Sequence, residues 1–105
     1  MPSSKGFADF ILTQLSPLKQ VRCRPMMGEF LLYYRDRLVG GIYDDRLLIK
    51  PVERAQTLLP EAPLLSPYPG AKPLLLAEDT DDADFLCFLI TSIYPQLPLS
   101  GSTVR

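Results

Sequence analysis

The chain has 105 residues, of which 47% are hydrophobic and 22% charged, with no histidine and a formal net charge of −1. This length suits one domain with a single core, and the composition excludes a disordered or fibrous chain. No stretch supplies the roughly 20 apolar residues that a bilayer span needs, and the first residues lack the pattern of a secretory signal. We therefore expect a cytoplasmic protein with one domain over residues 1–95 and a flexible tail over residues 96–105.

The first predicted elements are a helix and an edge strand. From Ser4 to Leu15, apolar residues recur at spacings of three and four, which is typical of a helix with one buried side. Ser3 or Ser4 can cap its start, and Pro17 limits its end. From Leu18 to Met27 the pattern is ambiguous: Val21 and Cys23 alternate with Arg22 and Arg24 as in an edge strand that leads into the next segment. Pro25 confines any such strand to a sheet edge, because proline has no N–H to donate.

Residues Gly28 to Lys50, GEFLLYYRDRLVGGIYDDRLLIK, predict a three-stranded antiparallel meander. Three apolar runs are separated by two short polar interruptions, which is the pattern of consecutive hairpins. Aspartate is a favoured turn residue, so Asp44-Asp45 indicates a turn rather than a metal or acid–base pair. Gly40-Gly41 indicates a bulge or close packing, because a phosphate-binding loop would open a helix and here a strand continues.

Alternation along the strands sorts the meander between the two faces of the sheet. The side chains expected to face the core are Phe30, Leu32, Leu47 and Ile49. The opposite face then carries an apolar patch that consists of Leu31, Tyr33, Tyr43 and Leu48. Such a patch needs a cover. The alternatives are a second copy of the chain or another protein partner, and a helix of the same chain.

The second half of the chain predicts a helix, a loop, a strand and a helix. The first helix runs from Val52 to Leu59, and a proline-dense loop leads to a strand at Leu74 to Leu76. The last helix runs from Asp81 to Tyr94, with Thr80 or Asp79 as its cap. Acidic residues in a first turn interact favourably with the helix dipole, which accounts for the acidic run without a metal site.

The sequence contains few of two residue types that commonly act as nucleophiles or as acid–base catalysts: it has two cysteines and no histidine. The absence of histidine excludes Ser–His and Cys–His nucleophile pairs and HExxH zinc sites. No cofactor or metal motif is present. Cys23 and Cys87 lie outside any CxxC arrangement and are expected to be reduced and mostly buried, with a disulfide only if the fold brings them together. An enzyme that uses Lys50 or the Asp44-Asp45 carboxylates is the weakest functional alternative.

Four stretches carry a family resemblance: MPSSKGFADFILTQL, RPMMGEFLLYYRDRLVGGIYDDRLLIKPV, PYPGAKPLLL and DDADFLCFL. Together they resemble the N-terminal domain of the TfoX/Sxy family of competence regulators, especially its short stand-alone members, and Met26 to Val52 is the most specific part. The resemblance implies an α+β fold, similar to the secretion-chaperone-like arrangement, with helices packed on an antiparallel sheet and no known catalysis. Glu29 and Leu31 stand where the family often has glycine, and the C-terminal helical domain of the longer activators is not in this chain.

Two functions are compared on this basis. The first is a non-catalytic module, linked to transcriptional regulation of competence or related genes, that makes protein contacts through the apolar patch or the sheet edges, with a homodimer as one form. The second is direct nucleic-acid binding through four arginines, Arg22, Arg24, Arg35 and Arg37. Residues 1–77 carry a net charge of only +3, whereas nucleic-acid-binding domains present a strongly basic face, so we favour protein contacts. Basic residues beside an edge strand also commonly prevent unwanted pairing.

Overall fold

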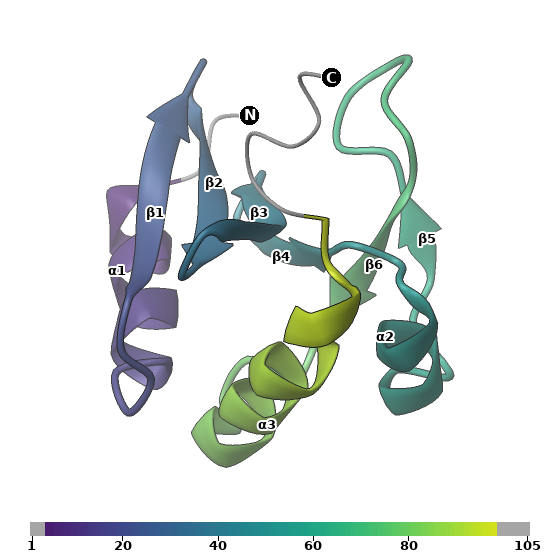
Figure 1. Ribbon diagram of the computed structural model, residues 1–105. Helices are drawn as coiled ribbons and strands as arrows, with labels where there is room; N and C mark the ends of the chain where they lie inside the picture. The colour runs from purple at the N-terminus through teal and green to yellow at the C-terminus, as the bar shows by residue number, and fades with distance from the viewer. Residues whose placement is uncertain (1–3, 99–105) are drawn as a thin grey trace.

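The computed structural model describes residues 4–98, which form a six-stranded antiparallel sheet with three helices on one face (Figure 1). The sheet order is β1-β2-β3-β4-β6-β5. The elements are α1 (Lys5–Gln14), β1 (Val21–Met26), β2 (Glu29–Tyr34), β3 (Arg37–Tyr43), β4 (Arg46–Ile49), α2 (Glu53–Leu58), β5 (Leu64–Leu65), β6 (Leu74–Ala77), α3 (Ala83–Ile93) and the 3-10 turn η1 (Tyr94–Gln96). The predicted α+β class, with helices packed on an antiparallel sheet that contains a meander, is confirmed.

The first four strands are joined by three hairpins with two-residue turns. These turns are Met27-Gly28, Arg35-Asp36 and Asp44-Asp45, because the flanking residues pair directly with each other. Asp44 and Asp45 have φ values of 53° and 55°, which a short polar side chain tolerates and which match the twist of the strands that a two-residue turn joins. The prediction that these aspartates form a turn is confirmed.

Helix starts are set by side-chain caps where a cap is present. The Ser4 hydroxyl accepts a hydrogen bond of 3.1 Å from the Phe7 amide, as predicted for α1. In α3 the cap is Asp82, which accepts from the Phe85 amide at 3.0 Å, and not Thr80 or Asp79. The chain makes turn hydrogen bonds before the helix begins, including one from the Asp82 amide to the Asp79 carbonyl, and these move the start of the helix toward the C-terminus.

Two other predictions need correction. The proline-dense loop contains the two-residue strand β5, which pairs with β6, and its shortness and flanking prolines hid it. The tail does not begin at residue 96: Gln96 belongs to η1, and the Leu97 side chain is 3% exposed within the core cluster. The rest of the predicted tail, residues 99–105, lies outside the described residues.

The hydrophobic core lies between the helices and one face of the sheet. Leu32, Leu47 and Ile49 are buried there as predicted, and Phe30 is half-buried against the same cluster. The helices contribute Ala8, Ile11, Ala55, Leu86, Leu89, Ile90 and Ile93. Burying one large aliphatic side chain contributes about 1.5–3 kcal/mol. The layer between the helices and the sheet holds most of these side chains, so it is the main source of stability and holds the helices against the sheet.

The apolar patch on the opposite face is not an exposed surface. Tyr33 and Tyr43 are 8% and 6% exposed, Leu48 is fully buried, and Leu31 is half-buried. The chain itself therefore covers three of the four members of the patch, which agrees with the expectation that the patch needs a cover. Alternation along a strand identifies the face to which a side chain points, but it does not show what covers that face.

Within residues 4–98, a side-chain ring and a loop cover this face, and no helix does. The ring of Tyr43 lies across Gly41, where an added Cβ would be 2.6 Å from a ring carbon. The loop between β5 and β6 also reaches this face, because Pro67 and Tyr68 line the same hollows as Tyr43. Because Gly41 has no side chain, the Tyr43 ring can lie over this part of the strand and cover the sheet face there.

Gly40 is required by close packing, as predicted. The register of the β2–β3 pair shifts between Leu32 and Tyr33, which marks a bulge beside this glycine. A Cβ added at Gly40 would collide with the Leu48 carbonyl oxygen on β4. Both predicted roles of the glycine pair, a bulge and a close approach of backbones, are confirmed.

Candidate interaction site at the β1 edge

The two edges of the sheet differ in what they offer a partner. The β5 edge has two residues, whereas β1 is a six-residue strand with exposed side chains from Arg24 to Met26. In Figure 1, β1 is the outermost strand on its side of the sheet and α1 lies behind it. The ambiguous stretch from Leu18 to Met27 thus contains the edge strand β1, which includes Pro25.

The outer side of β1 carries unpaired backbone groups. The Arg35 amide donates to the Gln20 carbonyl at 2.9 Å, so the peptide N–H of Val21 points away from β2. Alternation along the strand then directs the N–H and C=O groups of Val21 and Cys23 outward, and those of Arg22 inward to β2. Pro25 falls in the outward set, where the N–H that it lacks is not needed by the sheet.

Two of the predicted arginines lie side by side at this edge. The Arg22 guanidinium lies 4.8 Å from the Tyr33 ring centroid and donates to the Arg35 carbonyl at 3.0 Å. Arg24 follows two residues later, so it points to the same face, and its side chain is exposed. Arg35 stacks over Tyr34 and Tyr94, with distances of 5.4 and 5.7 Å to the ring centroids.

These arginines lack acidic partners in the described part of the chain. The ion pairs there are Lys5–Asp9, Arg37–Asp36 and Arg46–Asp44, so none involves Arg22, Arg24 or Arg35. No ion pair of the described residues would therefore be broken if these arginines bound an acidic partner. Their charges are therefore available to a binding partner.

Arg37, the fourth predicted arginine, has a structural position instead. It donates to the carbonyls of Tyr94 and Leu97 at 2.8 and 3.2 Å, and its guanidinium lies 4.5 Å from the Tyr94 ring centroid. A cation at these carbonyls satisfies the C-terminal end of the helical segment. The structure thus brings Arg22 and Arg35 together and leaves Arg24 exposed farther along β1 on the same face as Arg22, whereas Arg37 stabilises the fold.

A polar hollow of about 520 Å³ adjoins the arginines. It is lined by Gln20, Arg22, Arg35, Asp36 and Tyr94. The Tyr94 hydroxyl donates to Asp36 at 2.9 Å, and this hydrogen bond raises the pKa of Tyr94. Tyr94 therefore remains neutral at physiological pH, and the hollow presents two guanidinium groups beside one carboxylate.

The cysteines are free thiols with low reactivity. Burial, with a further contribution from Asp9, raises the pKa of Cys23 to about 11. Burial and then Asp84 raise the pKa of Cys87, whose sulfur donates to the Gln14 carbonyl at 3.6 Å. Because the thiolate is the reactive form, neither thiol is an activated nucleophile at neutral pH. The two cysteines do not form a disulfide in the structure, and both are half-buried rather than mostly buried as predicted.

The carboxylates at the β3–β4 turn hold local structure. The Asp45 carboxylate accepts from the Ser4 amide at 2.7 Å, which fastens the start of α1 to the turn, and Asp44 pairs with Arg46 at 3.6 Å. Lys50 is half-buried at the end of β4. Across residues 4–98, no group of three histidine, cysteine, aspartate or glutamate side chains is arranged to hold a metal ion.

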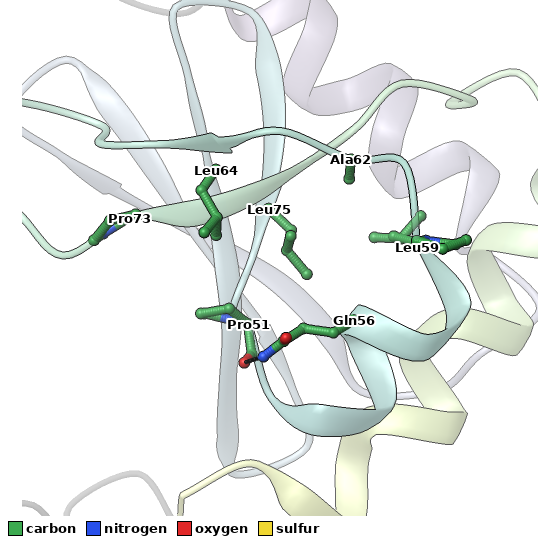
Figure 2. Close-up of a pocket in the computed structure, with 8 residues that line it drawn as sticks. Pro51, Gln56, Leu59, Ala62, Leu64, Pro73 and Leu75 are labelled. Atoms are coloured by element: carbon green, nitrogen blue, oxygen red, sulfur yellow. Dashed lines mark hydrogen bonds between the residues drawn. The ribbon is translucent and has the colours of Figure 1, made fainter.

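An apolar hollow of about 420 Å³ lies between α2 and the β5–β6 pair. Figure 2 shows Leu64, Leu75 and Gln56 around it. Its lining contains no ionisable side chain, and the Gln56 amide already donates to the Pro51 carbonyl at 2.8 Å. This hollow therefore has no side chain that could act as an acid or a base.

A second apolar hollow, also of about 420 Å³, lies at the tip of the β1–β2 hairpin. It is lined by Met26, Met27, Glu29, Tyr43, Pro67 and Tyr68. Met27 is 95% exposed at the turn. Sequence reasoning did not single out this feature, although two consecutive methionines beside a hairpin turn are a readable signal for an exposed apolar tip.

Comparison with known proteins gives a relative without an assigned function. The chain is 34% identical over 79 residues to an uncharacterised 12.7 kDa protein in the trpE 5′ region of Spirochaeta aurantia, and the alignment covers 75% of this chain and 69% of that protein. The chain belongs to the same family. No family model matches the sequence, and no solved structure matches it. Over residues 4–98, no helix combines the length and apolar character of a bilayer span.

Proposed function

We propose that the chain is a non-catalytic, TfoX-like interaction module of the cytoplasm that takes part in transcriptional regulation, of competence or related genes, through protein contacts at the β1 edge. The observation that carries the proposal is the pair Arg22 and Arg24, exposed on the edge strand of the sheet and without an acidic partner among the described residues. The apolar patch is covered by the chain itself, so the edge is the better place for a contact.

Physical chemistry supports a protein as the partner. The outer side of an edge strand can supply main-chain hydrogen bonds to an added segment, and charges beside it set the specificity and the association rate. A homodimer that pairs two β1 edges is disfavoured, because the arginines of both copies would meet. The expected partner is a different protein with an acidic surface.

Affinity purification from the native cell tests the proposal. We would compare the tagged wild-type chain with Arg22→Glu/Arg24→Glu and with Arg54→Glu/Lys72→Glu, which makes the same change of charge on exposed positions elsewhere. A protein recovered with the wild type and the control, but not with the β1 variant, supports the proposal. Recovery of no protein, or of proteins that all three chains retain equally, would contradict it.

Direct nucleic-acid binding is the second candidate. It is favoured by the stacking of Arg22 and Arg35 on tyrosine rings, an arrangement of cations and aromatic groups that also suits single strands. Three arginine–phosphate contacts would give a salt dependence with a slope of about −2 for a single strand. Affinity for a ten-nucleotide oligo(dT), measured at several salt concentrations with and without Arg22→Ala/Arg24→Ala/Arg35→Ala, tests this candidate. A slope near zero, or one that the substitutions leave unchanged, would exclude it.

A further inference from the structure

We propose that the outer side of β1 binds an extended acidic segment of a partner protein as an additional strand of the sheet, with acidic side chains at every second position beside Arg22 and Arg24. This inference rests on the proposed function and specifies the chemistry of the partner segment. It is drawn from the backbone orientation of β1, from its two faces and from the charges on them.

The backbone defines how far an added strand can extend. The outward groups are the N–H and C=O of Val21, the N–H and C=O of Cys23, and the C=O of Pro25, as fixed by the hydrogen bond from the Arg35 amide to the Gln20 carbonyl. Strand addition uses such groups in alternation. Because Pro25 has no N–H, the ladder loses a donor there, and the added strand is short.

The side chains define the sequence pattern of the added strand. Arg22 and Arg24 are two residues apart on one face, so their side chains repeat at about 6.6–6.8 Å along the edge. An added strand has the same period, and its residues opposite these arginines would point to the same face. Aspartate or glutamate at every second position therefore brings a carboxylate within reach of each arginine, and the Arg22 guanidinium turns from the Tyr33 ring toward the added strand to meet it.

The other face of β1 selects against acids at the intervening positions. The side chains of Val21, Cys23 and Pro25 point toward the face that carries α1. Asp9 on α1 is close enough to contribute to the raised pKa of Cys23. Because Asp9 is paired with Lys5, its charge does not decide the choice of side chain. The preference comes from Val21 and Cys23, which are half-buried against the core and offer a carboxylate no guanidinium. Neutral side chains are therefore preferred, and the recognised pattern is acidic, neutral, acidic.

The same charges argue against two other occupants. A second copy paired through β1 would bring its own Arg22 and Arg24 beside these arginines, and like charges on paired strands are destabilising. A nucleic-acid strand could meet the guanidinium groups but has no peptide groups with which to continue the backbone ladder of the sheet. The β5 edge has only two residues and no arginine.

Amide exchange on the isotopically labelled protein tests the inference directly. The probe is a nine-residue peptide with blocked ends that alternates glutamate and threonine, and its control is an isomer of the same composition with the glutamates grouped together. Near saturation, the alternating peptide should slow exchange of the Val21 and Cys23 amides by about tenfold or more, because these N–H groups become hydrogen-bonded. The Arg22 and Arg24 amides, which face β2, should change little.

Variants separate the backbone contribution from the charge contribution. Cys23→Pro removes one outward N–H and leaves the β1–β2 ladder intact, and Pro25 shows that the strand accepts proline in the outward set. It should lower peptide affinity by about tenfold or more. Arg22→Glu/Arg24→Glu should do the same and should gain affinity for a peptide that alternates lysine and threonine, whereas Arg54→Glu/Lys72→Glu should keep the wild-type preference.

Several outcomes would overturn strand addition. These are equal binding of the two glutamate peptides, binding that leaves the Val21 and Cys23 amides unprotected, and failure of the charge-reversed variant to accept the lysine peptide. Displacement of the peptide by oligo(dT) without protection of these amides would assign the edge to nucleic acid. If a natural partner depends on Arg22 and Arg24 but is retained by Cys23→Pro, the proposed function stands and strand addition fails. If no protein depends on these arginines, the proposed function itself fails.

Discussion

The two faces of the sheet are both covered, but by different means. Helices α1, α2 and α3 cover one face and bury a cluster that includes Leu32 and Leu47. The other face carries no helix in Figure 1, yet it buries Leu48 as completely. There, the Tyr43 ring and the β5–β6 loop form the cover. An apolar sheet face without a helix is therefore not by itself a binding surface.

This difference redirects the search for a contact site from the faces to the edges. A face covered by an aromatic ring and a loop leaves no large apolar area for a partner. The backbone of β1 remains unpaired on its outer side, and the arginines beside it lack acidic partners among the described residues. The contributions of the helices, of the Tyr43 ring with the β5–β6 loop, and of the strands between them can be separated by measuring the stability of single variants.

The largest loss of stability is expected for a substitution at Gly40, which lies in β3 between the two covered faces of the sheet. Gly40→Ala places a Cβ against the Leu48 carbonyl oxygen, which is backbone and cannot turn away. We expect a loss of more than about 4 kcal/mol in the free energy of unfolding, or failure to fold, measured by urea unfolding and circular dichroism. Gly6→Ala in the first turn of α1 meets only the Ser4 hydroxyl oxygen, at an ordinary contact distance of 3.9 Å, and should cost nothing. Equal stability of the two variants would contradict the close approach of β3 and β4.

Leu47 and Leu48 compare the two covers directly, because they are neighbours in β4 that point to opposite faces. Both are almost completely buried, with exposed fractions of 1% and 0%. We expect Leu47→Ala and Leu48→Ala each to lower the free energy of unfolding of the isolated chain by about 2–4 kcal/mol. A cost below about 1 kcal/mol for Leu48→Ala alone would show that its face is covered only in a complex.

Two arginines provide a smaller test, one on each side of the sheet. Arg37→Ala leaves the carbonyls of Tyr94 and Leu97 without a charged donor, and we expect a loss of about 1–3 kcal/mol in the free energy of unfolding. Arg22→Ala removes an exposed guanidinium from the Tyr33 ring and should cost less than about 1 kcal/mol. Urea unfolding of both variants checks this order, and the reverse order would show that Arg22 is structural.

The smallest effect concerns pH and Cys23, whose side chain packs on the helix-covered face. Its pKa is raised from 9.0 to about 11, so the folded state holds the thiol proton more tightly than the unfolded state. This contribution is complete below pH 9 and is lost as the pH rises toward 11. Because the group is partly exposed, we expect a loss on the order of 1 kcal/mol over this range. Urea midpoints for Cys23→Ala should fall less steeply there, and parallel curves would contradict the prediction.

Local patterns in the sequence predicted the elements and the meander well. Two-residue turns were visible because Asp44-Asp45 and Arg35-Asp36 interrupt apolar runs, and the strands on either side were strongly apolar. The first helix was delimited by Ser4 and by the proline after it. The strand β5 was missed, since two leucines between prolines carry no periodic signal.

The candidate site was predicted in part. Alternation placed Tyr33 and Leu48 on the correct face but could not show that a loop some 20 residues farther along the chain would fold over that face. Nor did the sequence distinguish Arg37 from the other arginines, because its partners are carbonyl groups about 60 residues away. Contacts over such distances depend on the assembled fold, which residue patterns within a short window do not describe.

The exposure of Met27 makes the hairpin tip chemically distinct from the rest of the sheet. With 95% of this residue in contact with solvent, against 37% for Met26, a mild oxidant should reach the Met27 thioether before that of Met26. Conversion to the sulfoxide turns a flexible apolar side chain into a polar one. The rate of that conversion, followed by mass spectrometry, would report whether anything rests on the tip of this hairpin in the cell.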